Sequence, residues 1–424
     1  ALIIIFYLNA LGGMGYSLIA PLFPPLCKEK GISNEISSYI ISIISLTEML
    51  TAIIFPRLSK KFETNKLMIF ALLGQTFVVF FFGFMVFIQN NSIFLFFALI
   101  NRLFQGFCNS VVNIISFSLI ALLTTKQEEI EKSMGYMELS WGVGTTIGPG
   151  IIGMFFDLGG YCLPYIIIGF VNFSGFFLFR SIPEEDLQSK SRKNTDADNS
   201  NNQTNVLKTD VSILKIILYP STLLFIGCII IEMNTSSFYL ATLVNYLKDS
   251  FSISTSRASL FFLCGTCGYI ICTQVISIFT KMLGNFGLIT ISHLFASLFC
   301  LFTAPAGFLP QSYWCIVIGI FCQGFIGATV NIPTFIETLN LGKLLIPNDH
   351  QLQRDIPSSI LNFSFYFGEL VIPTFGAWIA NMYRFQTSAY CAAWFSFIFF
   401  FIFGYYHFNK IKEYIKKKQE VSLE

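Results

Sequence analysis

The stretch QGFCNSVVNIISF at residues 105–117 returns as QGFIGATVNIPTF at residues 323–335. The two copies share seven identical residues in one register, at a constant offset of 218. A weaker pair has the same order of small residues and proline: Gly144, Pro149 and Gly153 against Gly368, Pro373 and Ala377. The repeats predict two equivalent halves related by an axis along the membrane normal, an arrangement typical of secondary transporters.

The composition places most of the chain in lipid. Of the 424 residues 54% are hydrophobic and 12% are charged, whereas a soluble domain has about 25% charged residues. A chain with 50 Phe residues would expose more apolar surface than water tolerates, which excludes an ordinary soluble enzyme. The 26 basic and 24 acidic residues form no single basic face, so we expect no nucleic-acid partner.

Twelve apolar segments are long enough to cross a bilayer, at about 20 residues each. They are 1–24, 36–56, 66–89, 93–123, 133–157, 160–182, 217–247, 256–280, 285–308, 312–341, 356–381 and 385–408. Their uninterrupted apolar runs lack the alternation of a barrel strand. We therefore predict an all-α membrane protein with twelve transmembrane helices in two six-helix repeats.

A polar stretch between the sixth and seventh segments divides the chain. It predicts an N-terminal half at 1–182, a disordered cytoplasmic linker at 183–212, a C-terminal half at 213–410 and a basic cytoplasmic tail at 411–424. With the linker in the cytoplasm, twenty basic residues lie on that side and five on the other. The positive-inside rule then places both termini and the linker in the cytoplasm.

Three motifs resemble those of the major facilitator superfamily. One is similar to the motif of its drug:proton antiporter branch, with Ile152 replacing a glycine: Gly135, Gly144, Gly148, Pro149 and Gly153. The second is Arg102-x-x-Gln105-Gly106, whose arginine the resemblance associates with proton coupling. The third, the loop 57–62, keeps basic residues but lacks the usual aspartate and glycine. Small residues at helical spacing also permit close helix packing, so packing and antiport are compatible explanations of the first motif.

Within that superfamily the chain resembles the solute carrier 18 family of vesicular amine carriers, particularly its polyamine branch. The likeness is carried by residues 16–24, 135–138, 160–165 and 332–337. It implies a vesicle or other organelle membrane. The first-span aspartate of the monoamine carriers falls at about Gly12 here, so their amine-binding scheme does not transfer whole.

Charged residues inside membrane spans are costly and indicate function. Six are present: Glu48, Arg102, Glu138, Glu232, Glu337 and Glu369. Five acids against one guanidinium favour protons or a cationic solute over an anion. We expect Arg102, Glu48 and Glu138 to couple protons. We expect the substrate to be bound by Glu232, Glu369 and Glu337 together with the amides Gln105, Asn113 and Asn331. Because Glu337 is about one turn from its helix end, snorkelling or gate closure is an equally good explanation for it.

These features predict a secondary transporter that exchanges an organic cation, of polyamine or monoamine type, for protons by alternating access. One alternative is the same fold carrying another small solute, and another is a non-transporting subunit or receptor associated with other membrane proteins. Three dispersed histidines and eleven scattered cysteines show no metal-ligand or nucleophile spacing. The sequence therefore predicts no enzyme activity, cofactor or metal.

The predicted topology is tested by limited proteolysis of sealed vesicles whose cytoplasmic face is outside. Protease should cut within 183–212 and leave two six-helix fragments on a denaturing gel, since a polar linker offers accessible backbone. Cleavage there only after the vesicles are opened would reverse the orientation.

Overall fold

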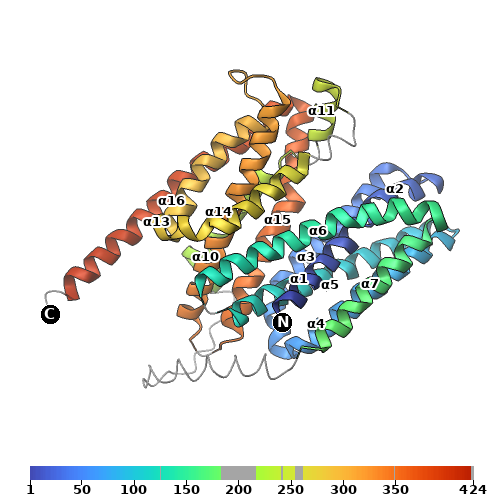
Figure 1. The fold of residues 1–424 in the computed structure, drawn as a ribbon, viewed down its shortest axis with the longest axis horizontal. Helices are drawn as coiled ribbons and strands as arrows, with labels where there is room; N and C mark the ends of the chain where they lie inside the picture. The colour runs from blue at the N-terminus through green and yellow to red at the C-terminus, as the bar shows by residue number, and fades with distance from the viewer. Residues whose placement is uncertain (125, 183–215, 240–241, 254–260, 348, 422–424) are drawn as a thin grey trace. The chain divides into compact units, whose positions relative to one another are not determined.

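The computed structural model describes the chain except residues 125, 183–215, 240–241, 254–260, 348 and 422–424. The described part is α-helical, with no strand in it, as Figure 1 shows. Its first helices are α1 (Leu2–Ser17), α2 (Ile19–Glu29), α3 (Asn34–Lys61), α4 (Thr64–Phe84), α5 (Asn91–Leu123), α6 (Gln127–Gly159) and α7 (Cys162–Arg180). They are followed by α10 (Pro220–Ser237), α11 (Leu243–Phe251), α13 (Phe261–Thr303), α14 (Tyr313–Leu345), α15 (Leu352–Met382) and α16 (Phe385–Val421). The predicted all-α class is confirmed.

Among the described residues, nine helical segments are long and apolar enough to cross a membrane. One of the nine, α13, covers two predicted spans, because it is interrupted only at Gly284 with φ 68° and ψ 165°. The helices α6 and α10 also cover predicted spans but are not among the nine. Two acidic residues in the first turn of α6, Glu128 and Glu129, reduce its apolar character. The predicted linker, 183–212, lies outside the described residues.

Packing contacts divide the chain into two compact units. Unit 1 comprises Ala1–Ile217 with Leu339–Phe367, and unit 2 comprises Leu218–Thr338 with Gly368–Glu424. The helices α14 and α15 therefore each contribute residues to both units. The division into halves at the linker stays a prediction.

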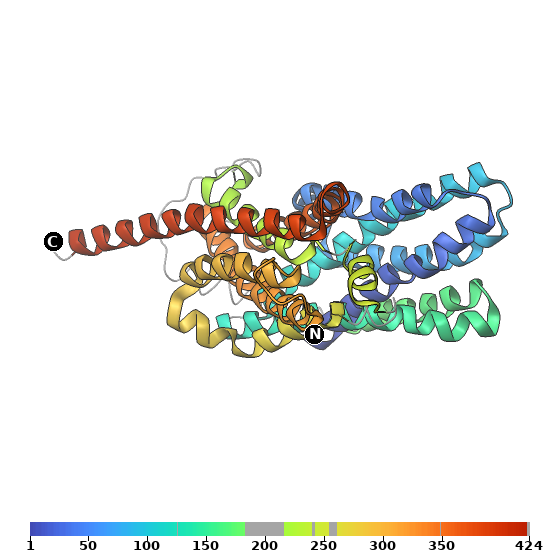
Figure 2. The ribbon, with the colours of Figure 1, turned by 90° about the horizontal axis from the view of Figure 1, so that it is seen from above.

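In unit 1, α1 packs on α6 and α7, and α4 packs on α5 and α7. The helix α3 packs on α5. Figure 2 shows these blue-to-green helices side by side. Aromatic rings fill the space between them: Phe23 is stacked on Phe94 and meets Phe82 edge-on. In unit 2, α16 packs on α13 and α10. There the ring of Phe286 meets those of Phe403 and Tyr406.

The contact between α6 and α1 depends on two glycines of the antiporter-like motif. A Cβ placed on Gly144 would collide with the carbonyl oxygen of Ala10, and one on Gly148 would collide with the hydroxyl of Ser17. The two helix backbones can approach closely because these side chains are absent. Gly135 is also buried in α6, whereas the side-chain surroundings of Pro149 and Gly153 lie outside what the structure describes.

We predict that Gly148→Leu lowers the Tm of the purified protein and abolishes or uncouples exchange, because the new side chain must separate α6 from α1. The matched control is Val143→Leu, since Val143 is 42% exposed on the same helix. Thermal unfolding and proton leak in proteoliposomes measure the two effects. Wild-type behaviour of Gly148→Leu would show that the close approach is dispensable.

Candidate functional site

The guanidinium of Arg102 joins three helices of unit 1. The side chain is 1% exposed, and its Nη1 donates to Oε1 of Gln105 at 2.6 Å while Nη2 donates to the carbonyl oxygen of Ile41 at 3.0 Å. Gln105 in turn donates from Nε2 to the carbonyl oxygen of Gly15 at 3.0 Å. Arg102 and Gln105 are three residues apart on α5 and therefore share a helix face. Their hydrogen bonds connect α5 to α3 and to α1.

A second polar cluster surrounds Glu48 of α3. The carboxylate, 1% exposed, accepts a short hydrogen bond at Oε1 from the amide of Asn109 on α5. Asn109 accepts at Oδ1 from Nε2 of Gln75 on α4, at 3.2 Å. Ser110 donates its hydroxyl to the carbonyl oxygen of Glu48 at 3.0 Å. Glu48 therefore accepts from neutral donors of α5, and Gln75 of α4 holds one of these donors, Asn109, in place.

The two clusters lie at different levels along α5. Arg102 and Asn109 are seven residues apart, which corresponds to a rise of about 10 Å along α5. The guanidinium donates hydrogen bonds to neutral oxygens, those of Gln105 and Ile41. The expectation that Arg102 pairs with Glu48 or Glu138 in some state of the cycle stays a prediction. Glu138 is half-buried on α6.

In unit 2 the carboxylate of Glu232 lies in a neutral hydrogen-bonding pocket. Glu232 is 2% exposed on α10 and accepts a short hydrogen bond from Ser236 and a bond of 3.2 Å from Nδ2 of Asn331 on α14. A Cβ on Gly327 would lie 2.8 Å from Oε1 of Glu232, so this glycine leaves the space that the carboxylate occupies. The other amide atom, Oδ1 of Asn331, is buried without a hydrogen-bond partner among the described residues. The sequence analysis expected both Glu232 and Asn331 at the substrate, and the structure brings them together.

The other predicted substrate residues make different contacts. Nδ2 of Asn113 donates to the hydroxyl of Tyr366 at 2.6 Å in unit 1. Glu337 is half-buried and accepts at Oε1 from Nδ2 of Asn285 at 2.6 Å. Glu369 lies on α15 in unit 2 with an exposed side chain.

Sequence reasoning missed two buried acids, Glu131 on α6, which is 1% exposed, and Asp355 near the start of α15. Asp355 is 0% exposed and accepts from the hydroxyl of Ser118 on α5 at 2.7 Å and from Nε2 of Gln351 at 3.3 Å. The same Nε2 lies 3.1 Å from the carbonyl oxygen of Ser59 and 3.0 Å from the hydroxyl oxygen of Thr64. The predicted span began at residue 356, which left Asp355 in a loop. The available signal was the spacing of four residues between Gln351 and Asp355, which puts both on one helix face.

We predict that Ser118→Ala destabilises the protein by about 1–3 kcal/mol, because a buried carboxylate oxygen would lose its donor. Ser116→Ala is the matched control: Ser116 is 0% exposed on the same helix, and its hydroxyl has no hydrogen-bond partner among the described residues. Thermal unfolding in detergent compares the two variants. Equal Tm values for them would show that the bond to Asp355 contributes no stability.

An internal sequence repeat, helices long enough to cross a membrane and polar clusters buried between those helices are together typical of a multi-pass membrane transporter. A family model described as Major Facilitator Superfamily matches residues 5–341, and the chain belongs to that family. The family resemblance found in the sequence is confirmed.

Curated relatives agree with the predicted branch. The chain is 21% identical over 384 residues to the MFS-type transporter SLC18B1 of Mus musculus, covering 89% of this chain and 79% of the relative. The SLC18B1 transporter of Rattus norvegicus is also 21% identical, over 380 residues with the same coverage. The likeness to the solute carrier 18 family is therefore confirmed at modest identity.

Solved structures share the fold. A bacterial homologue of the iron transporter ferroportin in the outward-facing state matches with a TM-score of 0.70 at 13% identity, over 95% of this chain and 98% of that chain. The transporter FucP in the outward conformation matches with a TM-score of 0.70 at 14% identity and the same coverage. At these identities the likeness establishes the major facilitator fold and leaves the transported solute open.

Proposed function

We propose that the protein is a proton-coupled antiporter of an organic cation, of polyamine or monoamine type, acting across an organelle membrane by alternating access. The observation that carries this proposal is the carboxylate of Glu232, buried at 2% exposure and held by the neutral donors of Ser236 and Asn331. A carboxylate without a fixed counter-charge in a low-dielectric interior binds a cation or a proton.

The atoms around Glu232 favour an ammonium group with N–H donors. The oxygens of Glu232 and the buried Oδ1 of Asn331 are acceptors on neighbouring side chains. The ring of Tyr269 lies beside Gly327, with Cδ2 3.7 Å from the position of an added Cβ, and an aromatic ring near a carboxylate can add a cation-π contact. A proton and an ammonium compete for the same carboxylate, which is the physical basis of exchange.

Unit 1 supplies the second part of the proposed mechanism. Protonation of Glu48 would remove a negative charge from the interior that also contains Arg102. Because the guanidinium is held by Gln105 and by the carbonyl of Ile41, a change in local charge alters which oxygens it prefers. Those oxygens belong to different helices, so a change of partner shifts helices relative to one another. Glu138 and Glu369 remain further candidates for proton and substrate contacts.

We predict that Glu232→Gln raises the KM for amine uptake by about 30-fold or more, because losing a charge-assisted contact costs about 2–5 kcal/mol. Arg102→Ala should abolish accumulation driven by a pH gradient. The measurement is uptake of a labelled polyamine or monoamine into proteoliposomes with an imposed pH gradient. Glu63→Gln is the control, since Glu63 is an exposed acid that pairs with Lys66 at 3.1 Å.

Each outcome has a distinct meaning. Saturable amine uptake that does not respond to the pH gradient would support an amine substrate and contradict coupling to protons. Absence of amine uptake by the wild type, with exchange of another solute, would overturn the proposed substrate class. Unchanged KM and unchanged accumulation in both variants would contradict the roles proposed for Glu232 and Arg102.

A further inference from the structure

Two side chains of the described chain donate hydrogen bonds to the carboxylate of Glu232. Oε1 accepts from the hydroxyl of Ser236, one turn further along α10, and Oε2 accepts from Nδ2 of Asn331 on α14 at 3.2 Å. Both donors are uncharged. Since Glu232 is 2% exposed, bulk water contributes little to its solvation. The two hydrogen bonds therefore supply most of the stabilisation that a negative charge receives there.

The titratable groups around Glu232 are mainly weak acids. Cys228 lies one turn before it on α10, and Tyr239 is buried within electrostatic range of its carboxylate. Tyr269 of α13 approaches the same part of α14. Ordinary thiols and phenols are mostly neutral at pH 7. The one carboxylic acid on the part of α15 in unit 2 is Glu369, and its side chain is exposed. The charge state of Glu232 thus depends mainly on its two donors.

The internal repeat contains a related arrangement in the first half. The residue 218 positions before Gly327 is Asn109, and Asn109 donates to Glu48. In unit 2 glycine at this position leaves the space that the carboxylate of Glu232 occupies, and the amide stands one turn later, at Asn331. In each half an uncharged amide of the repeated helix donates to an acid of a neighbouring helix. The two copies share this contact although different residues make it.

The donors act differently on the two states of the acid. A hydrogen bond donated to a carboxylate is stronger than one donated to a neutral carboxyl group, so it favours the ionised state. Burial has the opposite effect, because an apolar interior favours the neutral state. A buried acid without donors would hold its proton and offer no charge to a cation.

We propose that Ser236 and Asn331 are positioning residues that extend the ionised range of Glu232 to lower pH. They thereby set the pH range in which a cation can replace the proton on this carboxylate. The inference rests on the proposed function, in which a proton and a cation compete for Glu232. Neither residue has to touch the cation for this role.

The test is a pH titration of Glu232 in the full chain, reconstituted in lipid without any amine. Infrared spectroscopy follows the carbonyl band of the protonated carboxyl group, and Glu232→Gln identifies that band by removing it. Asn331→Leu, which has a similar shape and no donor, and Ser236→Ala should each raise the midpoint by about 1–2 pH units, because a lost donor disfavours the ionised state. Ser236→Thr retains a hydroxyl and should retain the wild-type midpoint.

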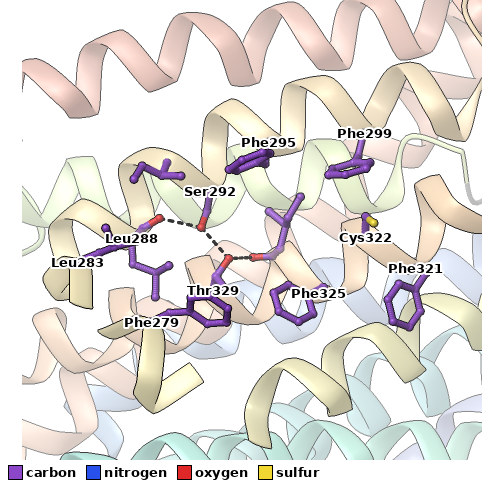
Figure 3. A pocket seen from close by; sticks show the side chains of 12 residues that line it. Phe279, Leu283, Leu288, Ser292, Phe295, Phe299, Phe321, Cys322, Phe325 and Thr329 are labelled. Carbon is purple, nitrogen blue, oxygen red and sulfur yellow. Dashed lines mark hydrogen bonds between the residues drawn. The ribbon is translucent and has the colours of Figure 1, made fainter. Parts of the chain in front are cut away.

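The matched control is Thr329→Val, two residues before Asn331 on the same helix. Figure 3 shows Thr329 on the wall of an apolar pocket between α13 and α14. Its hydroxyl oxygen lies 2.6 Å from that of Ser292 and donates to the carbonyl oxygen of Ile326 at 2.8 Å. Removing this hydroxyl alters the packing of α14 and spares the donors of Glu232. The control should therefore keep the wild-type midpoint.

Unchanged midpoints in both Asn331→Leu and Ser236→Ala would overturn the proposal. An equal shift in Thr329→Val would also overturn it, because the effect would then come from general loosening of α14. If Asn331→Leu fails to fold, the comparison of Ser236→Ala with Ser236→Thr decides. The titration contains no amine, so failure of amine uptake by the wild type would contradict the proposed function separately from this result.

Discussion

A polar group at membrane depth can gain a hydrogen bond only from inside the protein, because hydrocarbon offers none. This constraint explains why the buried charges of this chain are surrounded by amides, hydroxyls and carbonyls. Arg102 has Gln105 and Ile41, Glu48 has Asn109, and Glu232 has Ser236 and Asn331. Each of these bonds crosses between helices or fixes a side chain on one. The clusters that carry the proposed chemistry are therefore also the points that set which helices pack together.

The internal repeat shows how one scaffold acquires two different sites. Gln105 and its counterpart Gln323 both donate to a carbonyl on a neighbouring helix, at Gly15 and at Ala296. The position of Arg102 is taken in the second copy by Ile320, which is buried in an apolar cluster. The two copies thus share the glutamine that bonds to a neighbouring helix, whereas only the first copy has a charged residue, Arg102, three positions before it.

Sequence reasoning succeeded where one local physical rule decides the outcome. Long apolar runs predicted the helices, and the cost of buried charge singled out Glu232, which is buried and hydrogen-bonded to Asn331. It failed where contacts depend on how helices cross. Asn113 and Asn331 occupy equivalent repeat positions, yet Asn113 bonds to Tyr366 and Asn331 bonds to Glu232. The burial of Asp355 was also missed, because a helix end is exposed or covered only according to what packs against it.

The turn at Gly284 has a mechanical consequence. Its φ of 68° is strained for a residue with a side chain, although no atom within 4 Å would obstruct one. The backbone angle, and not crowding, therefore requires glycine. Gly284 is the one residue of α13 with non-helical backbone angles. A change in the angle between the two spans that it joins must therefore occur at its φ and ψ or distort one of the two helices.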